Sequence, residues 1–535
     1  MRNMRACAIA FVLLLTPVLL RGQALTPEVL AKPGPDAWPT YNGDYSGQRH
    51  SPLKQINTSN VDSLSLAWIY RATGFGPGGF GSVIKSTPLE VSGVLYFTMP
   101  DNVWAVDARS GREMWHFKYP PNEGGHIGQR GVAMLGDTLY FETPDCNLVA
   151  LNAKDGTEKW RKTIADVKLE YFCTMSPLVV ENHVITGVGG DSLDNPGFLE
   201  SHDAQTGELQ WRWNTEPAKG EPGFETWPNE EARTHGGGMT WMTGTYDPEL
   251  RLVYWGIGNP NPVHAGAGRK GDNVWTCSIV ALHVDTGKLE WGYQVSPHDT
   301  HDWDATQTPI LFNGEFKGKR RKLIAQASRN GYFFLLDRTN GEHLLTAPFI
   351  KTNWTLGINA KGQPIPNPAK EPTRNGTLVS PSSNGASNWV APSFNPQAGL
   401  FYVVASQSYS VFYLTAEGKA EGFAGRDDFL NYPGTIEAID YKTGAIQWKH
   451  DIGGSGPGLL TTEGGLLFTG DTSGHFMAID STSGKTLWHT TTGANQNNGA
   501  ITFEMDGKQY VVVGAGDSLY AFTLAQTPGG SHAAK

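Results

Sequence analysis

The sequence predicts an all-β fold, an eight-bladed β-propeller built from tryptophan-docking repeats. Two observations predict it: a repeated Ala-x-Asp-x-x-x-Gly-x-x-x-Trp motif, and an unmatched strand-like run around Trp68 near the N-terminus. In each repeat a strand ends in Asp, a turn needs Gly at positive φ, and a second strand carries an aromatic ring. Each copy therefore predicts one β-hairpin.

The repeat occurs six times, and a seventh copy is weaker. A hairpin of this kind cannot bury both faces alone, so neighbouring copies must stack, and radial stacking gives a propeller without long exposed edges. The copies are Ala105/Asp107/Gly111/Trp115, Ala150/Asn152/Gly156/Trp160, Ser201/Asp203/Gly207/Trp211, Ala281/His283/Gly287/Trp291, Ala438/Asp440/Gly444/Trp448 and Ala478/Asp480/Gly484/Trp488, with Leu335/Asp337/Gly341/Leu345 as the weaker one.

Seven copies and the run LSLAWIY around Trp68 suggest eight blades. We expect the last blade to close the ring by pairing this N-terminal strand with the C-terminal runs ITFEM, QYVVVGAG and LYAFTL. The spacing between copies is irregular, and the long gaps predict insertions at residues 216–238 and 346–388, which are rich in Pro, Gly and polar residues.

Residues 1–24 read as a secretory signal peptide, with Arg2 and Arg5 before an apolar run over residues 6–20 and small residues near the cleavage position. No later segment offers about 20 consecutive apolar residues, so no membrane span is expected after signal removal. The sequence thus predicts a periplasmic protein whose residues 25–535 form a single propeller domain.

Composition excludes one large class of function. The chain has a net charge of −10 and 18% charged residues, so it lacks the basic balance that would bind a nucleic-acid backbone. After signal removal, Cys146, Cys173 and Cys277 remain, an odd number that leaves at least one thiol unpaired and implies no disulfide framework. No Cys-x-x-Cys-His motif is present to attach haem.

The densest group of chemically active side chains is Pro-His-Asp-Thr-His-Asp-Trp-Asp at residues 297–304, between two strand-like runs. A loop on a rigid scaffold often carries function. Asp302 and Asp304 lie two residues apart, which on an extended backbone points both carboxylates to one side, where they can share a hard cation. The alternative is an acidic, solvated surface loop.

Five motifs resemble those of the quinoprotein alcohol dehydrogenases, eight-bladed enzymes that use pyrroloquinoline quinone. The resemblance covers nearly the whole mature chain, and the motifs occur in the family's order. They are GGGMTWMTGTYDPEL (236–250), YWGIGNPNP (254–262), GDNVWT (271–276), PHDTHDWDA (297–305) and SRNGYFFLLDRTNGE (328–342).

The resemblance implies a set of cofactor-binding residues. Trp241 matches the tryptophan on which the quinone lies flat, and Arg130 and Thr174 match residues that bind its carboxylates. Arg329 matches the arginine beside the reactive quinone oxygen, where a fixed positive charge stabilises the reduced form. Two further residues match the rim of the cofactor: Asn388 and Trp389.

The resemblance also implies a metal site. Asn259 matches a ligand that binds through its amide oxygen, and Asp302 matches the catalytic base that takes the substrate hydroxyl proton. Asp304 matches the aspartate that, in the family, accompanies a lanthanide ion rather than Ca²⁺. An added carboxylate favours an ion of higher charge.

Three departures from the family pattern affect this site. Ser192 stands at the position of the metal-binding glutamate, and the adjacent Asp191 would need a bulge to replace it. Gly124 and Gly125 replace the vicinal cysteines that cover the second face of the cofactor, so we assign His126 to that face. Lys85 replaces an acidic or amide residue and could pair with a cofactor carboxylate.

These observations predict a periplasmic dehydrogenase that oxidises an alcohol or sugar hydroxyl with pyrroloquinoline quinone and Ca²⁺ or a lanthanide ion. Its electrons would pass to a separate c-type cytochrome, since no haem site is encoded. The alternative is a non-catalytic or cofactor-poor propeller scaffold of the outer-membrane assembly type, for which Ser192 is the main argument. Against it, a scaffold has no need for Trp241, Arg130 and Asp302 together.

Overall fold

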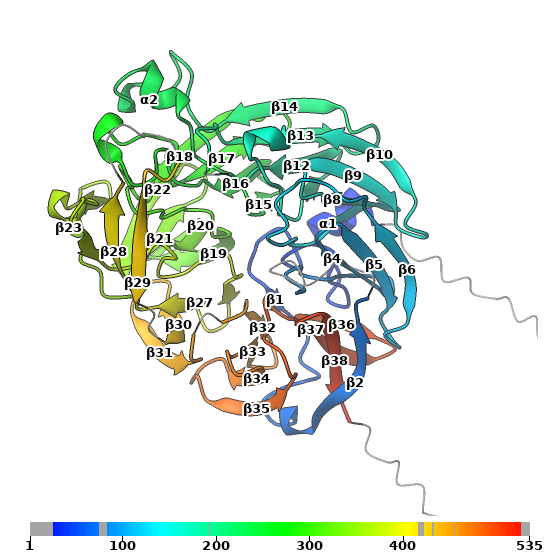
Figure 1. Ribbon diagram of the computed structural model, residues 1–535. Coiled ribbons are helices and arrows are strands. Elements are labelled where there is room, and N and C mark those ends of the chain that lie inside the picture. Colours follow the sequence, from blue (N-terminus) through cyan, green and yellow to red (C-terminus); the bar gives the residue numbers. More distant parts are fainter. Residues whose placement is uncertain are drawn as a thin grey trace, which may run out of the picture.

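The computed structural model describes residues 25–73, 83–190, 192–415, 422–430, 433–454 and 456–525. The predicted signal peptide and Asp191 lie outside these residues. Most of the described chain forms antiparallel four-stranded sheets that follow one another around a ring (Figure 1). Each sheet is called a blade here, and there are eight among the described residues, as the repeat predicts.

The first four blades use consecutive strands, with the innermost strand first. Blade 1 contains β3 (Leu89–Val91), β4 (Val94–Met99), β5 (Asn102–Asp107) and β6 (Glu113–Lys118). Blade 2 contains β7 (Ala133–Leu135), β8 (Thr138–Glu142), β9 (Asn147–Asn152) and β10 (Glu158–Thr163). Blade 3 contains β11 (Leu178–Val180), β12 (His183–Gly187), β13 (Phe198–Asp203) and β14 (Leu209–Asn214). Blade 4 contains β15 (Thr245–Asp247), β16 (Leu252–Gly256), β17 (Ser278–His283) and β18 (Leu289–Gln294).

Blade 5 keeps the same order, whereas blades 6, 7 and 8 depart from strict chain order. Blade 5 contains β19 (Ile310–Phe316), β20 (Lys319–Ala327), β21 (Tyr332–Asp337) and β22 (Glu342–Pro348). Blade 6 contains β26 (Ser393–Asn395), β27 (Leu400–Ser406), β30 (Gly434–Asp440) and β31 (Ile446–Asp451). Blade 7 contains β32 (Leu460–Thr462), β33 (Leu466–Gly470), β34 (His475–Asp480) and β35 (Thr486–Thr491), with β1 (His50–Ser51) added inside. Blade 8 contains β36 (Ile501–Met505), β37 (Lys508–Ala515), β38 (Ser518–Leu524) and β2 (Leu64–Arg71).

The repeat glycines have two roles. Gly111 has a φ of +68°, as the turn requires, and it also lies under the indole of Trp68 in the neighbouring blade. A β-carbon at Gly111 would lie 2.6 Å from that ring. The indole Nε1 of Trp68 donates to the carbonyl of Ala108 at 3.1 Å. The same packing recurs around the ring, so the motif joins blades as well as forming hairpins. The weaker copy lacks it, because Gly444 faces Ala347.

The ring closes as predicted. β2 pairs antiparallel with β38, from Leu64 opposite Leu524 to Arg71 opposite Ser518. The N-terminal strand is thus the outermost strand of a blade whose other three strands come from the C-terminal end of the chain. This pairing removes the sheet edge that an open ring would expose.

A segment that sequence reading did not single out crosses the ring near its axis, and we call residues 25–51 the axial strap. It contains α1 (Pro27–Ala31) and β1, and it contacts all eight blades. The contacts in blade order are Trp38 with Glu90, Leu25 with Gly136, Tyr45 with Val179, Tyr45 with Tyr246, Ser46 with Leu311, Gln48 with Phe394, β1 with β32, and Asp36 with Glu504.

Both predicted insertions leave the ring. Residues 216–238 contain η3 (Phe224–Thr226) and α2 (Glu230–Thr234), and residues 346–388 contain β23 (Thr355–Ile358), β24 (Pro364–Pro366), η5 (Pro368–Lys370) and β25 (Thr377–Val379). A further insertion, β28 (Tyr409–Leu414) and β29 (Gly425–Leu430), pairs with β25. The remaining 3₁₀ turns are η1 (Val61–Ser63), η2 (Val167–Leu169) and η4 (Gly266–Gly268). Within the described part of the chain, no helix has the length and apolarity needed to cross a bilayer.

The pairing of the cysteines is decided by which of them lie close together in the folded chain. Cys146 and Cys173 form a disulfide across 27 residues, and Cys277 is a buried free thiol. Burial raises the pKa of the Cys277 thiol well above its usual value. The odd count thus leaves one thiol unpaired, and sequence spacing alone gave no pairing.

Candidate active site

The predicted site residues gather at one end of the ring. Trp241 precedes the innermost strand β15, and Asp302 precedes the innermost strand β19. Asn259 and Arg329 follow the second strands β16 and β20. In an antiparallel sheet, the start of one strand and the end of its neighbour lie at the same edge. The topology therefore brings the four residues to one face of the propeller.

Asp304 lies at the centre of this group. Its Oδ2 accepts hydrogen bonds from Nη1 of Arg329 at 2.6 Å and from Nε1 of Trp241 at 3.1 Å. Its Oδ1 accepts from the backbone N–H of Asn259 at 2.8 Å. Asp304 is buried, with 3% of its surface exposed. One carboxylate thus joins three residues that the motifs place up to 88 positions apart in the chain.

Arg329 joins the two aspartates. Its Nη2 lies 3.4 Å from Oδ2 of Asp302 and donates to the carbonyl of Ser383 at 2.6 Å. The Asp302 side chain remains 20% exposed, so a small molecule can reach it. Asp302 has a φ of +67°, so the backbone here is not extended, and the predicted reason for the two carboxylates to meet was wrong. They meet through the guanidinium instead.

Asn259 completes a cluster of three oxygen-bearing groups. One terminal atom of its amide lies 2.8 Å from Oδ1 of Asp304 and 3.2 Å from Oδ1 of Asp302. With nitrogen in that position, the amide donates to both carboxylates; with oxygen there, three oxygens converge and need a cation between them. No group of three or more His, Cys, Asp and Glu side chains that could hold a metal occurs among the described residues. The amide is therefore essential to this set.

Arg130 and Thr174 lie together at the other end of the group. Nη1 of Arg130 donates to the hydroxyl of Thr174, and the guanidinium stacks 4.8 Å from the ring centre of Trp241 and 5.0 Å from that of Trp389. The Nε of Arg130 is buried and has no hydrogen-bond partner within the described chain. Burial lowers the pKa of Arg130 to about 10. A buried arginine with an unused donor fits an anionic ligand.

Lys85 adds a second positive charge beside Arg130. Its Nζ donates to the carbonyl of Ile127 at 2.5 Å, in the loop that leads to Arg130. Burial, followed by repulsion from Arg130, lowers the pKa of Lys85. Two like charges held near each other favour an anion between them, and a carboxylate satisfies this demand.

Three predicted residues stand apart from this network. Nε2 of His126 lies 2.6 Å from Oδ2 of Asp101 and Nδ1 lies 2.6 Å from the carbonyl of Gly124, while the side chain is 41% exposed. Asn388 bonds within its own turn, to Asn384 and to the N–H of Trp389. Ser192 is exposed. The assignment of His126 to the cofactor stays a prediction.

Sequence reading missed two side chains near the site. Phe172 packs its ring against Gly189, and its β-carbon faces Gly125, so the side chain lies next to the pair Gly124-Gly125. In the sequence it stands two residues before Thr174. Asp299 is buried in the loop of Asp302, and burial raises the pKa of its carboxyl to about 6. The spacing of the sequence motifs predicts neither position. The adjacent glycines Gly124 and Gly125, which leave space for a neighbouring side chain, are the sequence feature that points to Phe172.

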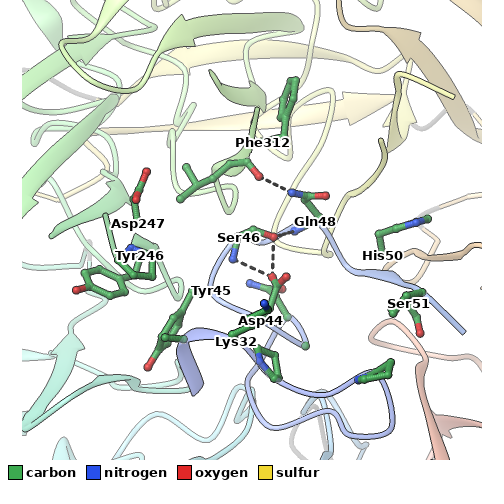
Figure 2. A pocket seen from close by; sticks show the side chains of 18 of the residues that line it. Lys32, Asp44, Tyr45, Ser46, Gln48, His50, Ser51, Tyr246, Asp247 and Phe312 are labelled. Carbon is green, nitrogen blue, oxygen red and sulfur yellow. Dashed lines mark hydrogen bonds between the residues drawn. The ribbon is translucent and has the colours of Figure 1, made fainter. Parts of the chain in front are cut away.

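A cavity of about 420 Å³ lies at the other end of the ring, between the axial strap and blades 4 and 5 (Figure 2). Asp44, Ser46 and Gln48 of the strap line it together with Tyr246 and Phe312. Tyr246 lies within β15, past the end of that strand where Trp241 stands. This cavity is therefore distinct from the candidate site.

Comparison with known families gives the context of this network. The model of the family described as "Glucose/ethanol/alcohol dehydrogenase, beta-propeller domain" matches residues 38–349. The model described as "Outer membrane protein assembly factor BamB" matches the shorter range 433–527. The first match covers more than half of the chain and includes every described site residue except Asn388 and Trp389.

Similar proteins extend the match to nearly the whole chain. The quinoprotein alcohol dehydrogenase PedH of Pseudomonas putida is 34% identical and aligns over 96% of this chain and 93% of its own. The lanthanide-dependent methanol dehydrogenase of Methylacidiphilum fumariolicum is 33% identical over 90% of this chain and 85% of its own.

Solved structures agree with the sequence matches. The quinohemoprotein alcohol dehydrogenase ADHIIG of Pseudomonas putida superposes with a TM-score of 0.87 at 31% identity, covering 95% of this chain and 83% of that one. A europium-containing methanol dehydrogenase superposes with a TM-score of 0.85 at 29% identity, covering 92% and 99%. Sequence, fold and full-length coverage agree, and the chain belongs to the family of pyrroloquinoline quinone-dependent alcohol dehydrogenases.

Proposed function

We propose that this protein oxidises an alcohol or sugar hydroxyl, with pyrroloquinoline quinone as cofactor and a metal ion beside it. One observation carries the proposal: Arg329 joins Asp304 to a partly exposed Asp302, and Asp304 in turn bonds Trp241 and Asn259. In this network Asp302 would act as the proton acceptor, Arg329 as the fixed positive charge and Trp241 as the flat aromatic surface. Such a combination suits the removal of a proton and a hydride from an alcohol.

Asp302 is the proposed catalytic base. A substrate hydroxyl that reaches its exposed carboxylate gives its proton to that carboxylate, while the carbinol carbon loses a hydride. Arg329 holds the Asp302 carboxylate in place and supplies positive charge where negative charge develops. When bound, pyrroloquinoline quinone supplies the two-electron acceptor, and a metal ion supplies a polarising charge.

The cofactor would be held by Trp241 on one face and by Arg130, Thr174 and Lys85 at its carboxylates. The unused Nε of Arg130 and the neighbouring Lys85 support this assignment, because both favour an anion. The residues proposed for its rim are Asn388 and Trp389, of which Trp389 already stacks on Arg130.

The metal would be held by Asn259, Asp302 and Asp304. Three protein oxygens are fewer than the roughly six to eight that a Ca²⁺ ion takes, so cofactor and water must supply the rest. Asp304 supports a lanthanide ion over Ca²⁺, since the added carboxylate favours higher charge, and a relative is named lanthanide-dependent. Asp191, next to the exposed Ser192, is a further proposed ligand that lies outside the described residues.

We place the enzyme in the periplasm, with a separate c-type cytochrome as electron acceptor. The signal-like residues 1–24 and the absence of a Cys-x-x-Cys-His motif from the sequence support these two assignments.

The proposal is tested with purified protein, pyrroloquinoline quinone, and either Ca²⁺ or La³⁺. Dye reduction is followed with primary alcohols, secondary alcohols and aldose sugars as separate substrates. We expect turnover that requires both cofactor and metal, and loss of turnover in Asp302→Asn with cofactor affinity retained. A loaded wild-type protein that oxidises none of these substrates, or an Asp302→Asn variant with full activity, would contradict the proposal.

A further inference from the structure

We infer that Asp299 is a positioning residue, which fixes the backbone on both sides of Asp302 so that its carboxylate faces Arg329. The inference rests on the proposed role of Asp302 as the base. Asp299 is buried, and none of the hydrogen bonds described above joins its side chain to the carboxylate of Asp302 or Asp304.

The contacts of Asp299 bracket Asp302. Oδ2 of Asp299 accepts hydrogen bonds from the backbone N–H of His301 at 3.3 Å and from that of Trp303 at 3.1 Å. These are the two residues that flank Asp302. Asp299 is 4% exposed, so water does not compete readily for the two N–H groups.

The backbone at Asp302 needs such support. Its φ of +67° lies in the left-handed region, which is unfavourable for a residue with a β-carbon. A non-glycine residue keeps this conformation only where its surroundings impose it. A single acceptor that binds the N–H before and the N–H after Asp302 imposes it from both sides.

Asp299 is itself anchored to the loop of Asn259. Nη2 of Arg269 donates to the carbonyl of Asp299 at 2.5 Å and to that of Val263 at 3.0 Å, while Nε donates to the carbonyl of Pro262 at 3.1 Å. Arg269 is fully buried. Arg269 thus couples the position of the Asp302 loop to that of the loop that carries Asn259.

The contacts require an oxygen acceptor and not a negative charge. Oδ1 of Asp299 is buried without a hydrogen-bond partner in the described chain, and Arg269 binds the backbone carbonyl rather than the carboxylate. An asparagine at this position keeps one oxygen where Oδ2 stands, so Asp299→Asn should preserve the two contacts, whereas Asp299→Ala removes both.

The test compares Asp299→Ala and Asp299→Asn with the wild type and with Asp480→Ala. Asp480 is a matched control, because its Oδ1 also accepts two backbone N–H groups, of Thr482 at 3.0 Å and Ser483 at 2.8 Å, in a repeat turn of blade 7. For each protein we measure kcat and KM, cofactor affinity by titration, and deuterium exchange of the peptide covering residues 297–306.

We expect kcat of Asp299→Ala to fall by about 100-fold, the effect of moving a catalytic group by roughly 1 Å, with KM and cofactor affinity little changed. Its 297–306 peptide should exchange faster. Asp299→Asn should recover both kcat and protection, and Asp480→Ala should change neither. A merely structural role would not separate kcat from cofactor affinity or be rescued by the amide.

Three results would overturn the inference: unchanged exchange in folded Asp299→Ala, unchanged kcat in that variant, or folded Asp299→Asn that is as impaired as Asp299→Ala. If Asp299→Ala does not fold, Asp299→Leu takes its place, since leucine keeps a similar volume and removes the acceptor; unchanged kcat and unchanged exchange in that variant would overturn the inference. Inactivity of the wild type refutes the proposed function instead, and the exchange measurement, which needs no turnover, then still decides whether Asp299 fixes the loop.

Discussion

Removal of the Asp304 carboxylate is the most informative perturbation of this protein. Asp304→Ala takes away one of the candidate metal carboxylates and also three hydrogen bonds, from Arg329, Trp241 and the N–H of Asn259. Two properties depend on this carboxylate: lanthanide-supported activity and the stability of the apo fold. The structure predicts an effect on both.

The loss of apo stability follows from burial. The side chains of Arg329 and Asp304 are 7% and 5% exposed, and breaking a buried ion pair by removing one partner costs about 3 to 5 kcal/mol. The N–H of Asn259 also loses its acceptor, which adds to the cost, although neighbouring effects do not sum. We therefore expect the free energy of unfolding of the apo protein to fall by about 3 to 5 kcal/mol.

The loss of metal affinity should be large. Loss of a residue that merely orients a metal ligand costs about 10 to 100-fold in affinity, and loss of a charged ligand should cost at least as much. La³⁺ should bind wild type more tightly than Ca²⁺ and far better with the quinone present, since the cofactor completes the set of ligands. Ser192→Glu should act in the opposite direction and strengthen binding.

The assay has two arms. Urea unfolding of the apo proteins, followed by tryptophan fluorescence, gives stability, and calorimetric titration with Ca²⁺ and La³⁺, with and without cofactor, gives affinity. Asp304→Asn is the matched variant, because it keeps the volume but must turn an NH₂ group toward one of the donors. Equal unfolding midpoints and equal metal affinities for wild type and Asp304→Ala would refute both the buried network and the metal site.

Three further predictions concern the cofactor, pH and ring closure. Trp241→Ala should weaken cofactor binding more than His126→Ala, since the indole adds about 1 kcal/mol of stacking; the reverse order in a fluorescence titration would place the ring on the other side. Burial raises the pKa of Glu216 from 4.5 to about 8, so this group's contribution to stability is fully present below pH 4.5. It falls by about 1.4 kcal/mol per pH unit as pH rises from 4.5 to 8, where the loss is complete. Glu216→Gln should flatten the fall in melting temperature between pH 5 and 8, and an unchanged slope would contradict this assignment. Deletion of residues 509–535 removes β38, the partner of β2, and should abolish the soluble monomer, which gel filtration detects. A truncated protein that elutes as a monomer with an unchanged melting temperature would argue against closure through this pairing.

The repeat was sufficient to predict the architecture because its information is local. Gly111 and its equivalents specify a turn, Trp68 and its equivalents specify a docking ring, and the seven copies together with the strand around Trp68 give the number of blades. Ring closure followed because an open ring would expose a sheet edge. The same motifs also identified Trp241, Asp304 and Arg329, which the structure joins in one network.

The path of the chain between those motifs was decided only by tertiary structure. The axial strap contacts eight separate blades through different residues, and the disulfide joins Cys146 to Cys173, so neither leaves a periodic signal. Asp302 appeared to share one side with Asp304 on an extended backbone, yet its left-handed φ is imposed by Asp299 and its approach to Asp304 by Arg329. The sequence thus determined which local units form and which residues are candidates for the site, whereas the orientation of these residues depended on hydrogen bonds formed within and between loops once the blades had packed together.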